Sequence, residues 1–171
     1  MTISTERLIL ESMELHQLEL YRQNYPLFCE SFGLMPKEKT VEEFMKNIFG
    51  IKINNIKNDP ENLLFYTYFL IWEKESGKEA GLVGFKGKKD CHDVSEIGYG
   101  IDPEFRKRGY MSEALKGICE TFIHNGLLSG IKAEVLKENS ASVKVLENTG
   151  FQRKEETEDC FYYFLFEKDL P

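Results

Sequence analysis

The chain has 171 residues, of which 42% are hydrophobic and 30% charged, and its formal net charge is −7 at pH 7. This length suits one domain with a sizeable core, and the composition is that of a globular protein rather than a disordered one. The acidic balance argues against general affinity for nucleic acid or anionic membranes, and no apolar run approaches the roughly 18 residues that a membrane helix needs.

The N-terminal residues and the cysteines both favour the cytoplasm. Glu6 and Arg7 interrupt a short alternating run, whereas a secretory signal peptide has a basic start followed by a longer apolar block. The four cysteines are scattered without a CxxC pair, and the three histidines form no HxxxH or HExxH motif. We therefore predict a cytoplasmic protein with free thiols and no metal site.

The first quarter of the chain is predicted to contain a strand and two helices. Arg7–Leu10 alternates like a short strand, and residues 14–32 have apolar side chains near the helical period of 3.6. Pro26 is expected to break or kink that first helix. Thr40 followed by Glu43 fits a capping box, which would open a second helix.

A run of strands is predicted next. Asn54–Asn62 is polar and contains a proline, so a loop is expected there. Leu63–Trp72 is rich in aromatic and β-branched residues, and it would form a hairpin with Ala80–Phe85 across the turn residues 75–78. Val94–Ile101 is predicted to be the next strand of the same sheet.

The last third alternates helices and strands. Residues 109–125 form the clearest predicted helix, because Met111, Ala114, Leu115, Ile118 and Phe122 fall on one face. A strand is expected at 131–136, a short helix at 139–149 with Asn139 as its N-cap, and two final strands at 151–155 and 161–167. The order β-α-α-β-β-β-α-β-α-β-β predicts an α/β fold of the α+β type, with about seven strands in one twisted sheet and about four helices, in a single domain spanning 1–171.

The segment from Glu96 to Leu115 carries the chemistry. A strand ends near Ile101, a loop with Pro103 follows, and the basic run 106–108 leads through Gly109 into the strong helix. The first N–H groups of a helix lack internal partners and the helix dipole is positive there, so this order predicts a cradle for a pyrophosphate. The alternative is a solvated basic loop. No GxxxxGK[ST] motif occurs, and Pro103 occupies the place of the third glycine in a dinucleotide fingerprint.

Two motifs in this part of the chain resemble the GNAT acetyltransferase superfamily. Arg106-Lys-Arg-Gly-Tyr-Met111 is similar to that family's Arg/Gln-x-x-Gly-x-Gly/Ala cradle, with methionine in place of the small last residue. Asn139 to Phe151 is similar to the family's Asn-x-x-Ser/Ala…Gly-Phe helix. The Gly-Tyr-Met-Ser-Glu-Ala opening most resembles the branch of ribosomal-protein N-terminal acetyltransferases, and the resemblance implies a mostly antiparallel sheet.

The resemblance implies acetyl-CoA, or coenzyme A, as the ligand. Backbone groups near the end of the strand would pair with the pantetheine arm, the amides that follow would hold the pyrophosphate, and an asparagine would anchor the cofactor near its thioester. The cofactor-binding residues so predicted are Gly100, Ile101, Arg106, Lys107, Arg108, Gly109, Tyr110, Met111, Ser112 and Asn139.

Two residues are predicted to be catalytic. An attacking amine must be neutral, and Glu96 is the candidate general base because strand alternation places it opposite Ile97 and Tyr99, toward the family's cleft. An exposed strand glutamate is the alternative. The tyrosine that many family members use as a donor to the leaving thiolate is replaced by Leu146, so Ser142, one turn earlier, is the candidate donor; a simple helix-start serine is the alternative.

The acceptor is predicted to be a primary amine of a protein N-terminus or a small molecule. Lys154–Asp159 places four carboxylates between the last two strands, where they would attract a cation or simply solvate a hairpin tip. Aromatic residues of the first helices would line an acceptor pocket or belong to the core: Tyr21, Tyr25, Phe28, Phe32 and Phe44.

Other functions are weighed beside acetyl transfer. Leu146 favours a non-catalytic acyl-CoA-binding sensor, and a nucleic-acid-binding module through Arg106–Arg108 is disfavoured by the net charge. Phe161–Phe166 is an exposed terminal strand that would serve for pairing in a homodimer.

Overall fold

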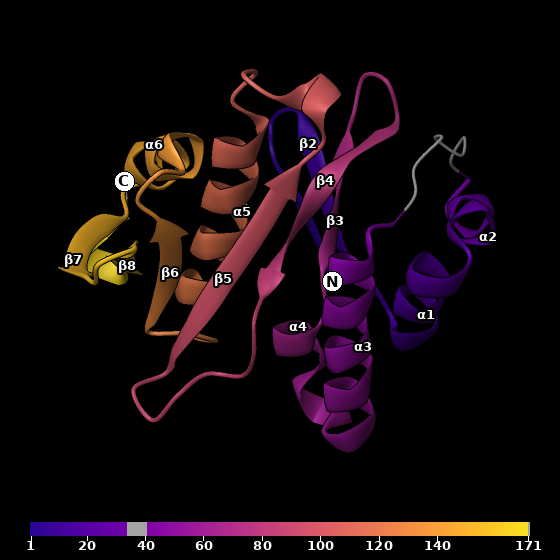
Figure 1. Ribbon diagram of the computed structural model, residues 1–171, viewed down its shortest axis with the longest axis horizontal. Helices are drawn as coiled ribbons and strands as arrows, with labels where there is room; N and C mark the ends of the chain where they lie inside the picture. Colours follow the sequence, from indigo (N-terminus) through magenta and orange to yellow (C-terminus); the bar gives the residue numbers. More distant parts are fainter. Residues whose placement is uncertain (34–40, 171) are drawn as a thin grey trace.

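The computed structural model describes residues 1–33 and 41–170, and it arranges them as a twisted mixed sheet with helices on both faces (Figure 1). The strands are β1 Thr2–Ser4, β2 Leu8–Ser12, β3 Phe69–Glu73, β4 Lys78–Phe85, β5 Val94–Ile101, β6 Gly130–Leu136, β7 Gln152–Glu156 and β8 Cys160–Phe166. The helices are α1 Leu15–Gln23, α2 Tyr25–Ser31, α3 Glu43–Asn58, α4 Leu63–Tyr66, α5 Tyr110–His124 and α6 Ser140–Asn148. The predicted fold class is confirmed, although the described residues contain eight strands and six helices rather than about seven and four.

The sheet has the strand order β1-β2-β3-β4-β5-β6-β8-β7. All neighbouring strands are antiparallel except β5 and β6, which are parallel. A parallel pair requires a crossover connection, and here the crossover contains α5. The strongest predicted helix therefore lies beside the single parallel junction of the sheet.

Two apolar cores cover the two faces of the sheet. Strand alternation sends Phe69 and Ile71 of β3 into the core beneath α5 and α6, and it sends Leu70 into the core shared with α1, α2 and α3. The first core contains Phe122 from α5, and the second contains Phe49 from α3. Because β3 and β4 are buried on both faces, their sequences show continuous apolar runs rather than alternation.

The N-terminal predictions needed two corrections. A strand, β1, precedes the predicted one, and the first helix is divided into α1 and α2 at Asn24. The Asn24 side chain caps α2 by accepting a hydrogen bond from the Leu27 N–H at 3.2 Å, and Pro26 occupies the first turn, where a proline is tolerated. The expected interruption near Pro26 is confirmed. The capping box at Thr40 lies outside the described residues.

The region between residues 54 and 72 was partly mispredicted. The expected loop Asn54–Asn62 begins as helix, because α3 continues to Asn58 with Ile53 and Ile56 buried on the same face as Phe49. The first residues of the expected strand Leu63–Trp72 form α4 instead, and β3 begins only at Phe69. A short apolar run does not distinguish helix from strand by its periodicity, which explains the error.

The elements that surround the predicted site agree with expectation. Strand β5 has the predicted bounds, α5 and α6 differ by a residue at each end, and Asn139 caps α6 by accepting from the Ser142 N–H at 3.1 Å. Among the described residues, no helix is both long and apolar enough to cross a membrane.

Candidate active site

The two parallel strands separate soon after they meet. Strand β5 pairs with β6 only from Val94 to Glu96, opposite Gly130 to Lys132. From Ile97 onward β5 stays paired with β4 through Ile101, so the edge that turns toward β6 has no strand partner among the described residues. Figure 1 shows β5 leaning away from β6 in this part. Backbone groups of such an edge require another partner, either water or an extended ligand.

The loop after β5 is anchored to the sheet at its start. The Asp102 N–H donates to the Ala80 carbonyl at 2.8 Å, and the Phe105 side chain is buried. Arg106 Nε donates to the Ile101 carbonyl at 3.3 Å. Lys107 and Gly109 both have left-handed backbones, with φ of 61° and 79°. Such a conformation is costly for lysine and free for glycine, and it forms the sharp turn into α5.

The N-terminus of α5 presents unpaired donors beside exposed cations. The first internal bond of the helix runs from the Glu113 N–H to the Gly109 carbonyl at 3.1 Å. Within the described chain, the N–H groups of Tyr110, Met111 and Ser112 have no acceptor. The basic side chains 106–108 are exposed around them. Free N–H groups at a helix N-terminus beside exposed cations are an arrangement that suits an anion such as a phosphate group.

Met111, which departs from the family motif, does not obstruct this site. Its side chain is 5% exposed and lies in the core with Ala114 and Leu115. Tyr110 is also turned inward, with 8% exposed. The Met111 side chain therefore fills space between α5 and the sheet, and it leaves the backbone amides of the first turn accessible.

Glu96 lies where β5 and β6 separate, and it is paired with two cations. Lys86 Nζ forms an ion pair with Oε1, and Lys132 Nζ lies 3.7 Å from Oε2. Its side chain is 22% exposed. Gly98 and Gly100, on the same face by strand alternation, line a cleft, and so does Lys86. The carboxylate thus adjoins the cleft across the Lys86 ammonium.

Helix α6 approaches the open strand edge through Tyr99. The Tyr99 hydroxyl donates to the Ser142 carbonyl at 3.2 Å, and it thereby bridges β5 and the first turn of α6. The Ser142 side chain also forms a hydrogen bond with Tyr99. Leu146 is fully buried in the core, so its position supplies no polar group to the site. Asn139 is exposed, and its side-chain oxygen is engaged in capping α6.

A cleft of about 830 Å³ opens on the face of β5 that is turned away from α5 and α6. Its floor contains Gly98 and Gly100, and its wall is formed by α3. Phe44 and Ile51 of that wall are 71% and 62% exposed, which is high for large apolar side chains. Among the aromatic candidates, Phe44 lies at the cleft, whereas Phe28 belongs to the core shared with α1, α2 and α3.

Tyr21 and Tyr25 are core residues with a polar contact. Both hydroxyls donate to the buried Glu79 carboxylate, at 2.9 Å to Oε1 and 2.5 Å to Oε2. Burial, together with the Glu79 charge, raises the pKa of both phenols far above the ordinary range. Tyr21 also contributes to the lining of the cleft. The Glu79 carboxylate therefore lies behind the part of the cleft lining that Tyr21 forms.

Lys52 is a site residue that the sequence analysis missed. It lies on α3, lines the cleft, and is only 5% exposed. Its Nζ donates to the Phe85 carbonyl at 2.6 Å and the Thr67 carbonyl at 3.4 Å, and it lies 4.2 Å from the centre of the Tyr68 ring. Burial lowers the pKa of this ammonium to about 7. A lysine at a core position of the helical stripe was the available signal, because Lys52 falls beside Phe49 and Ile53.

The acidic hairpin Lys154–Asp159 contributes no residue to this cleft. Two of its neighbouring cations, Arg153 and Lys137, form ion pairs with Glu156. Every described residue of β7 is exposed. These carboxylates therefore lie outside the lining of the cleft. Their exposure agrees with the alternative that they form a solvated hairpin tip.

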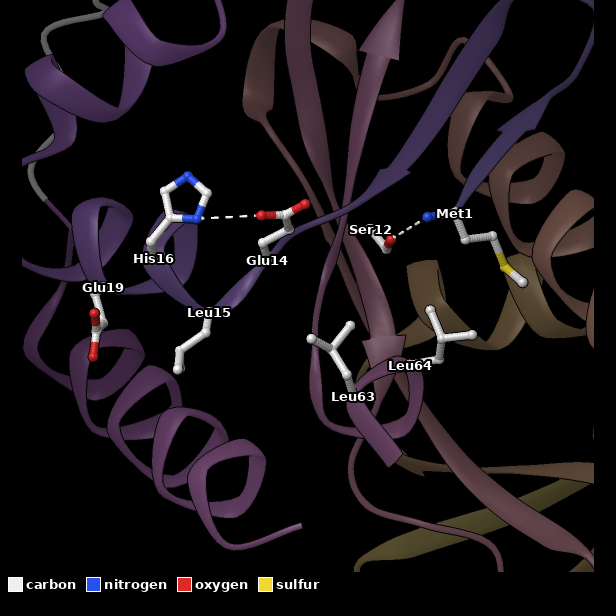
Figure 2. Close-up of a pocket in the computed structure, with 8 residues that line it drawn as sticks. All are labelled: Met1, Ser12, Glu14, Leu15, His16, Glu19, Leu63 and Leu64. Carbon is white, nitrogen blue, oxygen red and sulfur yellow. Dashed lines mark hydrogen bonds and ion pairs between the residues drawn. The ribbon is translucent and has the colours of Figure 1, made fainter. Parts of the chain in front are cut away.

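A second hollow, of about 560 Å³, lies away from α5 and α6. Figure 2 shows its lining from the start of α1, the end of β2 and α4, with ion pair His16–Glu14 and the hydrogen bond from the Met1 ammonium to Ser12. Its lining contains no residue of the basic run or of β5. The cradle and the 830 Å³ cleft are thus the better candidate site.

Comparisons with known proteins show the family and the fold of the chain. Residues 7–152 match the model of the family described as "Acetyltransferase (GNAT) domain". An uncharacterized N-acetyltransferase, p20, of Bacillus licheniformis is 26% identical over 90% of this chain and 83% of its own length. Among solved structures, the ribosomal-protein-S5-alanine acetyltransferase of Vibrio fischeri has a TM-score of 0.72 at 19% identity, covering 100% of this chain and 99% of its own. RimL, a ribosomal α-N-protein acetyltransferase in complex with coenzyme A, has a TM-score of 0.70 at 17% identity, covering 97% and 98%.

Proposed function

Because the chain belongs to the GNAT acetyltransferase domain family, we propose that it transfers an acetyl group from acetyl-CoA to a primary amine. The observation that carries this proposal is the separation of β5 from β6 beside the unpaired N–H groups of α5. One feature offers an extended edge to an arm-shaped ligand, and the other offers donors to a pyrophosphate. A cytoplasmic location stays part of the proposal.

The residues present fit coenzyme A. The open edge of β5 at Ile101 would pair with the pantetheine arm, whereas the Gly100 carbonyl faces β4. The amides from Lys107 to Ser112 would hold the pyrophosphate, because the Arg106 N–H already donates to the Pro103 carbonyl at 3.3 Å. The exposed side chains of the basic run add charge without filling the turn, because Gly109 has no side chain. The cofactor would supply an activated acyl thioester, and RimL, with a similar fold, binds coenzyme A.

Proton handling is assigned to groups around the cleft. A lysine amine has a pKa of about 10.4 and an α-amine about 8, so the acceptor must lose a proton before it attacks. Glu96 is the proposed general base, acting through water because Lys86 and Lys132 occupy its oxygens. The Ser142 hydroxyl is the proposed donor to the departing thiolate.

The acceptor enters, in this proposal, through the cleft between β5 and α3. Its floor contains Gly98 and Gly100, and its apolar wall includes Phe44 and Ile51. A peptide N-terminus or a small amine with an apolar portion suits such a surface. The Vibrio fischeri protein and RimL, which have a similar fold, are ribosomal-protein acetyltransferases, and this supports a peptide amine as the first acceptor to test.

A non-catalytic acyl-CoA sensor is the second candidate. It is favoured by Leu146, whose buried side chain supplies no hydroxyl where many family members have a tyrosine. The two candidates share coenzyme A binding and differ only in turnover. A mass-shift screen of peptides and small amines with acetyl-CoA separates them, because only the enzyme adds an acetyl group to an acceptor.

Gly109→Glu tests the cradle directly. A glutamate there places a negative side chain against the anion site and strains a backbone with φ of 79°. We expect coenzyme A binding by titration calorimetry to weaken at least about 100-fold. Gly77→Glu is the matched control, since Gly77 has φ of 63° in the remote β3–β4 turn with open space around it. Wild-type affinity in Gly109→Glu would refute the proposed site.

A further inference from the structure

Arg7, at the turn between β1 and β2, reaches the cradle from the other end of the chain. Its Nη1 donates to the Arg108 carbonyl at 3.0 Å, on one side of Gly109. Its Nε donates to Glu113 Oε2 at 2.7 Å, on the other side. The guanidinium also lies 4.6 Å from the centre of the Tyr110 ring. One side chain therefore holds both flanks of the glycine turn.

The bond to Arg108 sets the direction of a donor in the cradle. All described peptide bonds are trans. In a trans peptide, the carbonyl and the N–H of the following residue point in opposite directions. When Arg7 holds the Arg108 carbonyl, the Gly109 N–H is turned away from Arg7. The hydrogen bond from Arg7 thus fixes the peptide that joins Arg108 and Gly109, next to the left-handed residues Lys107 and Gly109.

Glu113 completes the clamp. Its Oε1 accepts from the Arg7 N–H at 2.7 Å and from the Thr5 hydroxyl at 2.6 Å, so the first turn of α5 is bound to the β1–β2 turn. Burial alone would raise the pKa of Glu113, but hydrogen bonds from Thr5 and Arg7 outweigh it and lower that pKa. Arg7 offsets a carboxylate that would otherwise repel an anion one turn away.

We propose that Arg7, through its bonds to Arg108 and Glu113, is a positioning residue that orients the backbone donors of the cradle toward the pyrophosphate of coenzyme A. This inference rests on the proposed function. Arg7 is assigned no contact with the ligand. Its contribution comes through the peptide at Arg108 and the first turn of α5.

The test compares two ligands that share the pantetheine arm. Coenzyme A carries the pyrophosphate and pantetheine does not, so only the first uses the cradle. In Arg7→Met we expect the dissociation constant for coenzyme A to rise about tenfold, with that for pantetheine changed less than about twofold. Arg7→Lys, which keeps the charge without the forked donors, is expected to resemble Arg7→Met.

Arg22→Met is the matched control. Arg22 Nε donates to the Lys46 carbonyl at 2.9 Å, so it makes the same kind of bond between α1 and α3, away from the cradle. We expect both ligands to bind it as they bind wild type. Glu113→Gln removes the other half of the clamp with little change of shape, and it should also weaken coenzyme A selectively.

Three outcomes overturn the inference. Equal loss for both ligands in Arg7→Met would mean a general structural role, unchanged affinity for coenzyme A would mean no role, and full affinity in Arg7→Lys would mean charge alone. A wild-type protein that binds no coenzyme A would overturn the proposed function as well. Failure of the Arg7 inference is thereby distinguished from failure of the proposed function, because in the first case the wild-type protein still binds coenzyme A.

Discussion

The buried ammonium of Lys52 makes an unusual prediction about stability and pH. It lies in the wall of the cleft, bound by two carbonyl oxygens and a tyrosine ring, with no carboxylate partner in the described chain. Burial lowers its pKa from 10.5 to about 7. We predict that Lys52→Met removes a pH-dependent part of the free energy of unfolding.

The sign follows from proton counts. Between pH 7 and 10.5 the unfolded chain keeps the Lys52 proton and the folded chain has lost it, so stability from this group rises with pH. Below pH 7 both states are protonated and the folded state carries the full cost of a buried charge. The difference between the two pKa values implies about 2 kcal/mol of added stability from pH 7 to pH 9.

Urea denaturation of wild type and Lys52→Met between pH 6.5 and 9 measures this effect. The loss of hydrogen bonds to Phe85 and Thr67 gives a constant offset, so the diagnostic quantity is how the difference changes with pH. We expect wild type to gain about 2 kcal/mol on the variant over that range. Lys57→Met, on the exposed side of the same helix, is the control and should show a constant difference. A constant difference for Lys52→Met would refute the reasoning.

Further predictions concern the sheet and the proposed chemistry. Gly81→Ala would place a methyl group 2.2 Å from the Gly100 carbonyl oxygen, and we expect it to lower the free energy of unfolding by roughly 1–3 kcal/mol, while Gly87→Ala, with open space, should change it little. Glu96→Gln should lower kcat roughly 100-fold in steady-state assays and leave coenzyme A affinity intact. Ser142→Ala should likewise lower turnover more than it weakens coenzyme A binding; equal effects on both would contradict its role as a donor.

Local patterns were sufficient for the elements that build the cradle. The apolar face from Met111 to Phe122 specified α5 almost to the residue, and Gly109 marked its start because a left-handed turn is needed there. Asn139 specified the start of α6 by capping it. Each of these signals acts between residues close in sequence, where spacing alone determines geometry.

The errors fell where packing overrides local preference. Residues 63–66 are apolar enough for a strand, yet they form α4 because Phe65 and Tyr66 fill the two cores from a helical turn. Helix α3 runs past Asn54 because Ile53 and Ile56 continue its buried stripe. No window of the sequence contains the partners that decide these cases.

The amino-acid sequence by itself determined the class of the fold, the family motifs and the candidate anion cradle, because strand, loop, glycine and helix follow one another within twenty residues. Tertiary structure decided the rest. Only the folded chain shows that β5 and β6 part after Glu96, that Lys52 is buried beside the cleft, and that Arg7 clamps Arg108. These arise from contacts between distant residues, whose geometry is set by the sheet and not by any local pattern.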